Sequence, residues 1–99
     1  MKRVTFRKSM MNGKSSEPVK GWLFDVQGHA LVAHRIGSKW RITHFDTGLC
    51  VQSLPATTRA EAIDLFETRV SDGLVDMAKL AKGAAEHPTL NTLTPEDVA

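Results

Sequence analysis

The sequence predicts an α+β domain: a four-stranded antiparallel β-meander packed on one face by one or two C-terminal α-helices. Closely spaced turns separate β-type segments between residues 21 and 54, and apolar residues alternate along those segments. An apolar pattern of helical spacing follows them. A chain of 99 residues can bury one core of this kind.

The first two turns predict the register of three strands. Residues 27–28 and 37–38 are glycine-containing pairs between β-type segments, which is typical of tight hairpins. Pairing outward from these turns places Ala33 between Trp22 and Ile42 on neighbouring strands. Because side chains alternate between faces, Trp22 and Trp40 should both lie on the face that the helices cover.

The third turn allows two registers for the last strand. A three-residue loop over 46–48 would turn the apolar side chains of that strand to the wrong face. A four-residue loop over 45–48, with Gly48 left-handed, pairs Ile42 with Val51 and keeps the inner face continuous. We therefore expect the longer loop.

A helix should begin near Arg59, because Thr58 and Glu61 have the spacing of a capping box ahead of apolar residues at helical intervals. Asp72 and Gly73 then interrupt or kink the pattern before a second helical segment that Gly83 ends. The pattern leaves open whether this is one long helix or two.

These elements divide the chain into a basic N-terminal arm at 1–20 with a short edge strand, a sheet-plus-helix domain at 21–83 and an irregular tail at 84–99. The net charge is only +2, but the cations gather toward the start and the acidic residues toward the end. A cationic arm suits an anionic partner, nucleic acid included. Of the six cations in this arm, the predicted contact residues are Lys2, Arg3, Arg7, Lys8 and Lys14.

The opposite face of the sheet is the predicted contact surface for a partner, since it combines apolar and hydrogen-bonding side chains. The alternative is that the tail or the second helix folds back over Leu23 and Val32 and makes them part of a core. The predicted surface consists of Leu23, Val32, His34, Lys39, Arg41, Thr43 and Gln52.

No pattern in the sequence indicates catalysis, a cofactor or a metal site, and we expect the protein not to be an enzyme. Cys50, the single cysteine, should lie two strands away from His34, which is too far for a thiol–imidazole pair. We expect a half-buried structural cysteine in a reducing cytoplasm. No apolar segment is long enough to span a membrane.

The segment 39–48, followed by 58–62, resembles small uncharacterised proteins of phages, plasmids and integrated elements. Those proteins share a Trp-containing strand, a Thr-Gly turn and a Thr-x-x-Glu-Ala helix start. The resemblance implies accessory roles, including inhibition of host defence by anti-CRISPR-like proteins, which act by binding a protein.

The same segment is similar to the N-terminal domain of phage-type integrases, in which three antiparallel strands against one helix lie in the DNA major groove. That similarity implies base or phosphate contacts from His34, Lys39, Arg41 and Gln52. The sequence therefore predicts a non-catalytic module that binds another macromolecule. A protein partner is the first hypothesis, sequence-tolerant DNA binding the second and a homodimer the third.

Overall fold

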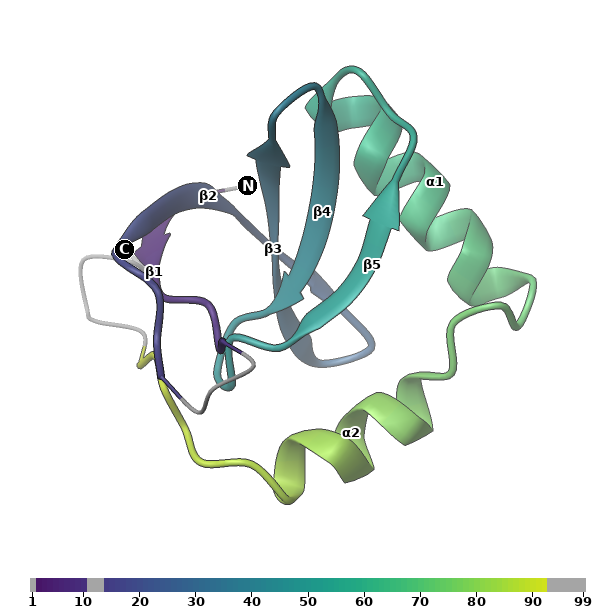
Figure 1. Cartoon of the computed structure of the whole chain (residues 1–99). Helices are drawn as coiled ribbons and strands as arrows, with labels where there is room; N and C mark the ends of the chain where they lie inside the picture. The colour runs from purple at the N-terminus through teal and green to yellow at the C-terminus, as the bar shows by residue number, and fades with distance from the viewer. Residues whose placement is uncertain (1, 11–13, 93–99) are drawn as a thin grey trace.

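The computed structural model describes residues 2–10 and 14–92 and has a five-stranded antiparallel sheet with two helices (Figure 1). The strands lie in the sheet in chain order. The α+β class and the meander are thus confirmed, but the predicted number of four strands is wrong because residues of the predicted arm add a fifth. The elements are β1 (Lys2–Phe6), β2 (Val19–Val26), β3 (His29–Ile36), β4 (Lys39–His44), β5 (Cys50–Leu54), α1 (Arg59–Ser71) and α2 (Met77–Ala85).

The hairpins joining β2, β3 and β4 have the predicted register. Trp22 pairs with Ala33, and Ala33 pairs with Ile42. The first turn needs left-handed backbone at both of its residues, with φ of 52° at Gln27 and 82° at Gly28. Trp22 and Trp40 therefore share the face of the sheet toward α1, as the alternation predicted.

The last hairpin agrees with the prediction at its turn and differs beyond it. The His44 N–H donates to the Leu49 carbonyl at 2.8 Å, and Gly48 has a φ of 71°, as expected for the four-residue loop. Ile42, however, lies across from Gln52 and not from Val51, because β5 carries an extra residue in a bulge. Val51 still packs against the core beneath α1.

The helical region forms two helices. The Thr58 side chain caps α1 by accepting from the Glu61 N–H at 3.2 Å. Gly73, with a φ of 78°, ends the helical path, and Asp76 caps α2 by accepting from the N–H groups of Ala78 and Lys79. Phe66 on α1 is fully buried against the sheet.

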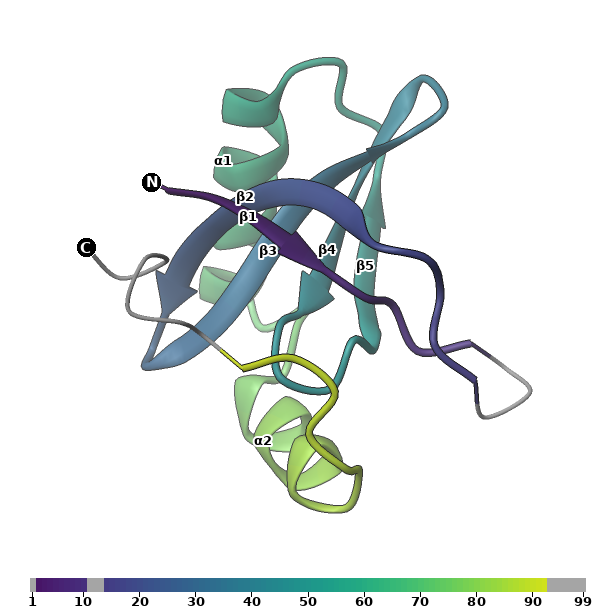
Figure 2. The same ribbon diagram turned by 90° about the vertical axis from the view of Figure 1, so that its left-hand side faces the viewer.

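A second core lies on the other face of the sheet, which the sequence predicted to be exposed or covered by the tail or the second helix. Here β2 curves and carries β1 across β3 and β4, so that β1 and α1 lie on opposite sides of the sheet (Figure 2). Gly21 makes the curve possible, since a Cβ there would collide with Val32. The buried apolar residues of this second core are Val4, Phe6, Val32 and Phe45.

The segment after α2 is irregular, as predicted for the tail, but it is fastened to the domain. The Asn91 side chain accepts from the Arg7 N–H at 2.8 Å and donates to the Arg7 and Phe45 carbonyls at 2.9 and 2.7 Å. Phe6 and Asn91, both outside the predicted 21–83 unit, are therefore buried parts of the fold. The predicted arm and tail also include residues 1, 11–13 and 93–99, which lie outside the described structure. No helix among the described residues is long and apolar enough to cross a bilayer.

Candidate functional site: the free edge of the sheet

Four residues of the predicted contact surface lie in or against the second core. Val32 and Thr43 are fully buried, His34 is 1% exposed and Leu23 packs against the buried cluster. Their predicted exposure is wrong, because β1 and Phe45 cover this face. The alternative, in which the tail or the second helix covers Leu23 and Val32, is right that Val32 is core but wrong about the cover, which is β1 and Phe45, and Leu23 is only partly buried.

His34 and Thr43 form a buried polar pair under this cover. The His34 Nε2 lies 2.6 Å from the Thr43 Oγ1, and the Phe6 ring packs edge-on against the imidazole at a centroid distance of 5.0 Å. Burial, followed by the nearby charges of Lys8 and Arg41, lowers the pKa of His34 to about 4. The imidazole is therefore neutral at physiological pH, and it cannot contact a base or a phosphate in the way that the integrase similarity implied.

The other three residues of the predicted surface, Lys39, Arg41 and Gln52, do not lie together in the structure. Gln52 turns toward α1, where its Oε1 accepts from the Arg69 guanidinium at 2.7 Å, because the bulge reverses its expected face. Lys39 is exposed beside the β3–β4 turn. Arg41 is half-buried on the outer face of β4, and its Nε donates to the Ser53 Oγ at 3.3 Å.

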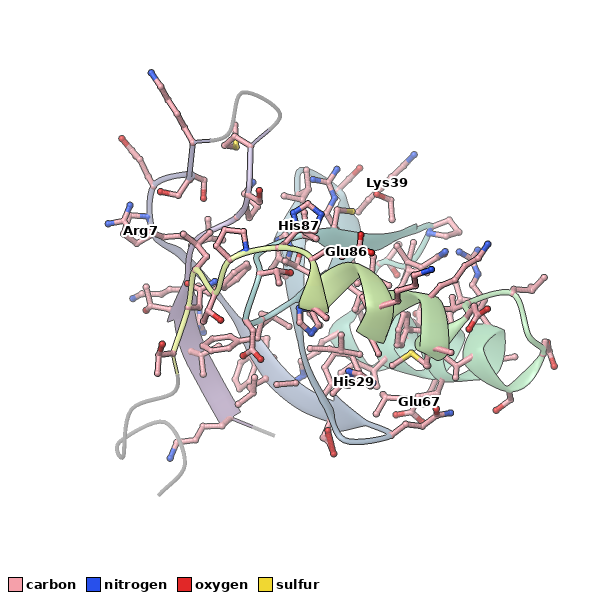
Figure 3. All side chains as sticks on the ribbon, turned by 90° about the horizontal axis from the view of Figure 1, so that it is seen from below. Arg7, His29, Lys39, Glu67, Glu86 and His87 are labelled. Carbon is pink, nitrogen blue, oxygen red and sulfur yellow. The ribbon has the colours of Figure 1, made fainter. Side chains whose placement is uncertain are left out.

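The cations of the predicted basic arm also do not gather on one surface. The Arg3 guanidinium lies over the Trp22 ring, and the Arg7 guanidinium donates to the Ser16 carbonyl at 3.0 Å. Figure 3 shows Arg7 and Lys39 projecting from different parts of the molecule. Among the predicted arm residues, Lys8 is the one that lines a hollow together with Arg41.

The two edges of the sheet differ in their protection against pairing with another chain. β1 ends one edge and carries Lys2 and Arg3, charged side chains of the kind that discourages edge-to-edge pairing. β5 ends the other edge with the sequence Cys-Val-Gln-Ser-Leu, which has no charged residue. Its bulge and the following Pro55 confine the pairing surface to a short segment.

A hollow of about 550 Å³ lies directly against β5. Cys50, Val51 and Gln52 form one wall, and the α1–α2 connection with the start of α2 forms the other. Leu74 in that connection is 71% exposed, the most exposed large apolar side chain among the described residues. We call this hollow the β5 cleft.

A smaller hollow of about 160 Å³ lies on the opposite face of the sheet, next to the beginning of β5. We call it the Lys8–Arg41 hollow. Its position depends on the segment after β1, which is held against the third turn by the Ser9 N–H donating to the Gly48 carbonyl at 2.9 Å. Its walls are Lys8, Ser9, Met10, Arg41, Thr43, Gly48 and Cys50.

Cys50 lines both hollows and is exposed, so the prediction of a half-buried structural cysteine is wrong. The cause is its place at the start of an edge strand, where no neighbouring strand covers it. Among residues 2–10 and 14–92, no group of three or more His, Cys, Asp or Glu residues could hold a metal ion. The His44 Nδ1 instead lies 2.9 Å from the Thr47 Oγ1 in the third turn.

Neither the exposure of Leu74 nor the β5 cleft was predicted from the sequence. The signal that could have found them is the Asp72-Gly73 interruption, because a break there lets the following apolar residues leave the core-facing stripe of a continuous helix. Comparison of the chain with protein-family models, curated proteins and solved structures finds no match.

Proposed function

We propose that this protein is a non-catalytic module that binds a protein partner by pairing an extended segment of that partner with β5. The observation that carries the proposal is an uncharged edge strand beside a cleft of mixed polar and apolar lining. An edge strand offers unpaired N–H and C=O groups to an added strand, and adjacent pockets for alternate side chains supply selectivity. The β5 cleft, with Val51, Leu74 and Leu80 in its walls, is such a pocket.

DNA reading by the outer sheet face has less support. A groove-reading sheet needs donors and acceptors on its exposed face. Here His34 is buried and Gln52 is bonded to Arg69 on the other side of the sheet. The favoured biological role is an accessory function of a mobile genetic element, such as inhibition of a host defence protein, which rests on the sequence resemblance.

The test uses capture from a host lysate, followed by hydrogen–deuterium exchange of the complex. The wild type should capture a protein that slows exchange of the β5 amides. Leu74→Asp should abolish that capture with little effect on stability, because the side chain is 71% exposed. Thr68→Asp, at an exposed position on α1, is the matched control and should capture normally.

A partner that Leu74→Asp retains, or whose protection maps to a surface away from β5, would refute the proposal. Purified wild-type protein should run as a monomer in gel filtration. A stable dimer whose β5 amides are protected would instead support the third hypothesis, in which a second copy pairs with this edge.

A further inference from the structure

The two hollows flank the same strand on opposite faces of the sheet. The β5 cleft lies on the side of α1 and α2, whereas the Lys8–Arg41 hollow contains Arg41 and Thr43, whose side chains point to the outer face. Cys50 at the start of β5 belongs to both. A segment paired along β5 would therefore pass between them.

Side chains of an extended segment alternate between the two faces of the sheet. Every second residue of a segment paired with β5 would point toward the β5 cleft, and the residues between would point toward the outer face. Between the charged side chains of Asp76 and Lys79, the cleft offers Val51, Leu74 and Leu80, which suit apolar side chains. The Lys8–Arg41 hollow offers a different chemistry.

Two cations line that hollow, and none of its walls in the described part of the chain is a carboxylate. Among the described residues, neither Lys8 nor Arg41 is in an ion pair, and the described contact of the Arg41 guanidinium is the bond to the Ser53 hydroxyl. Ser9 and Thr43 add polar groups to the walls. The same two cations lie near His34, behind Thr43, where they add to the lowering of its pKa that burial chiefly causes.

The backbone holds Lys8 in place. Its N–H donates to the Ser16 Oγ at 2.8 Å, and its carbonyl accepts from the Ser16 N–H at 2.8 Å. Arg41 is held by its position in the middle of β4. The two cations are therefore presented from fixed backbone, which lowers the entropy lost when they bind an anion.

Resting on the proposed strand pairing, we infer that the partner segment is acidic: an Asp or Glu side chain on its outer face enters the Lys8–Arg41 hollow, and apolar side chains on its other face enter the β5 cleft. The carboxylate accepts hydrogen bonds from the Lys8 ammonium and from the guanidinium of Arg41. The recognised pattern is thus an extended segment in which acidic and apolar residues alternate.

A second copy of this chain fits the site less well. Its β5 carries no acidic residue and would leave both cations without a counter-charge. Duplex DNA could supply phosphates to the two cations, but it has no apolar side chains for the β5 cleft. The two cations favour an anionic ligand, and the apolar residues of the β5 cleft favour apolar side chains. An acidic protein segment meets both conditions.

The experiment uses the full-length protein and three synthetic peptides in which valine alternates with glutamate, threonine or lysine. Binding is followed by NMR through the amide shifts of Cys50–Leu54 and by titration calorimetry. The glutamate peptide should shift these amides and bind roughly tenfold or more tightly than the threonine peptide, as expected for a hydrogen bond to a charged group. The lysine peptide should bind most weakly.

Charge reversal provides the decisive comparison. Arg41→Glu should remove the preference for the glutamate peptide and favour the lysine peptide. Lys8→Ala should reduce the preference without reversing it. Lys20→Glu, an exposed charge reversal on β2 outside both hollows, should leave the order of affinities unchanged.

The outcomes separate the two proposals. Equal β5 shifts with the glutamate and threonine peptides, unaffected by Arg41→Glu, would overturn the acidic segment and leave strand pairing intact. Absence of any β5 shift with all three peptides would overturn the inference and weigh against strand pairing itself. Salt-dependent duplex DNA binding that Arg41→Glu abolishes, with no peptide binding, would replace it with a phosphate-binding site.

Discussion

Acidification should destabilise this protein through the buried imidazole of His34. The imidazole lies in the second core beside Phe6 and next to two cations, and its pKa falls from the ordinary 6.5 to about 4. The unfolded chain therefore takes up the proton at a higher pH than the folded chain does. The stabilisation from the neutral imidazole is complete above about pH 6.5 and is lost as the pH falls toward about 4.

The magnitude follows from the shift. One pKa unit corresponds to about 1.36 kcal/mol, so a shift from 6.5 to about 4 gives roughly 3 kcal/mol as an upper value. Stabilities of small domains are on the order of 5–15 kcal/mol, so this loss would be a large part of the total. His44, whose pKa is lowered chiefly by burial, adds a loss of the same sign.

Urea unfolding followed by tryptophan fluorescence at a series of pH values measures the effect. The control is His34→Gln, whose amide can still bond to the Thr43 hydroxyl but does not titrate in this range. Contributions from His44 and the carboxylates cancel in the difference between wild type and variant. That difference should change by about 3 kcal/mol between neutral pH and about pH 4. Parallel pH profiles for the two proteins would refute the assignment of a buried neutral imidazole.

Three substitutions test the features that hold the fold. Gly21→Ala should destabilise the protein by about 1–3 kcal/mol in urea unfolding, because the added methyl group collides with Val32; an unchanged midpoint would contradict the close approach. Asn91→Ala should lower the free energy of unfolding by about 1–3 kcal/mol and accelerate hydrogen exchange of the Arg7 amide, whose N–H loses its acceptor. Unchanged protection of that amide would count against the Asn91–Arg7 bond. Thr58→Ala should lower stability by about 1 kcal/mol, whereas Thr58→Ser should retain the cap and the stability; equal losses in both would exclude capping as the cause.

Local patterns in the sequence were sufficient for the hairpins and for the beginning of α1. The glycine pairs at the turns fix register through short-range backbone geometry, and the Thr58 cap acts within four residues, so neither depends on distant parts of the chain. The bulge at Val51 escaped prediction because it reverses the face of Gln52, whose side chain bonds to Arg69 on the distant helix α1.

The cover over the outer face depends on contacts between distant segments. A short apolar pattern around Val4 and Phe6 indicates an edge strand, but it does not show that β2 curves far enough to carry that strand over Val32. Gly21 is needed for the curve, yet its role is visible only once Val32 lies against it. The same error moved His34 from the predicted contact surface into the core, while the uncharged sequence of β5 could have been read directly.

The clasp made by Asn91 has a consequence for synthesis of the protein. Asn91 reaches Arg7 across 84 positions, so this contact cannot form until residue 91 has left the ribosome. The hairpins between β2 and β4 need only neighbouring residues and can form well before that. During the interval the Phe45 carbonyl lacks its hydrogen bond from the Asn91 side chain. Chains stalled before residue 91 should therefore be the ones that chaperones and proteases engage.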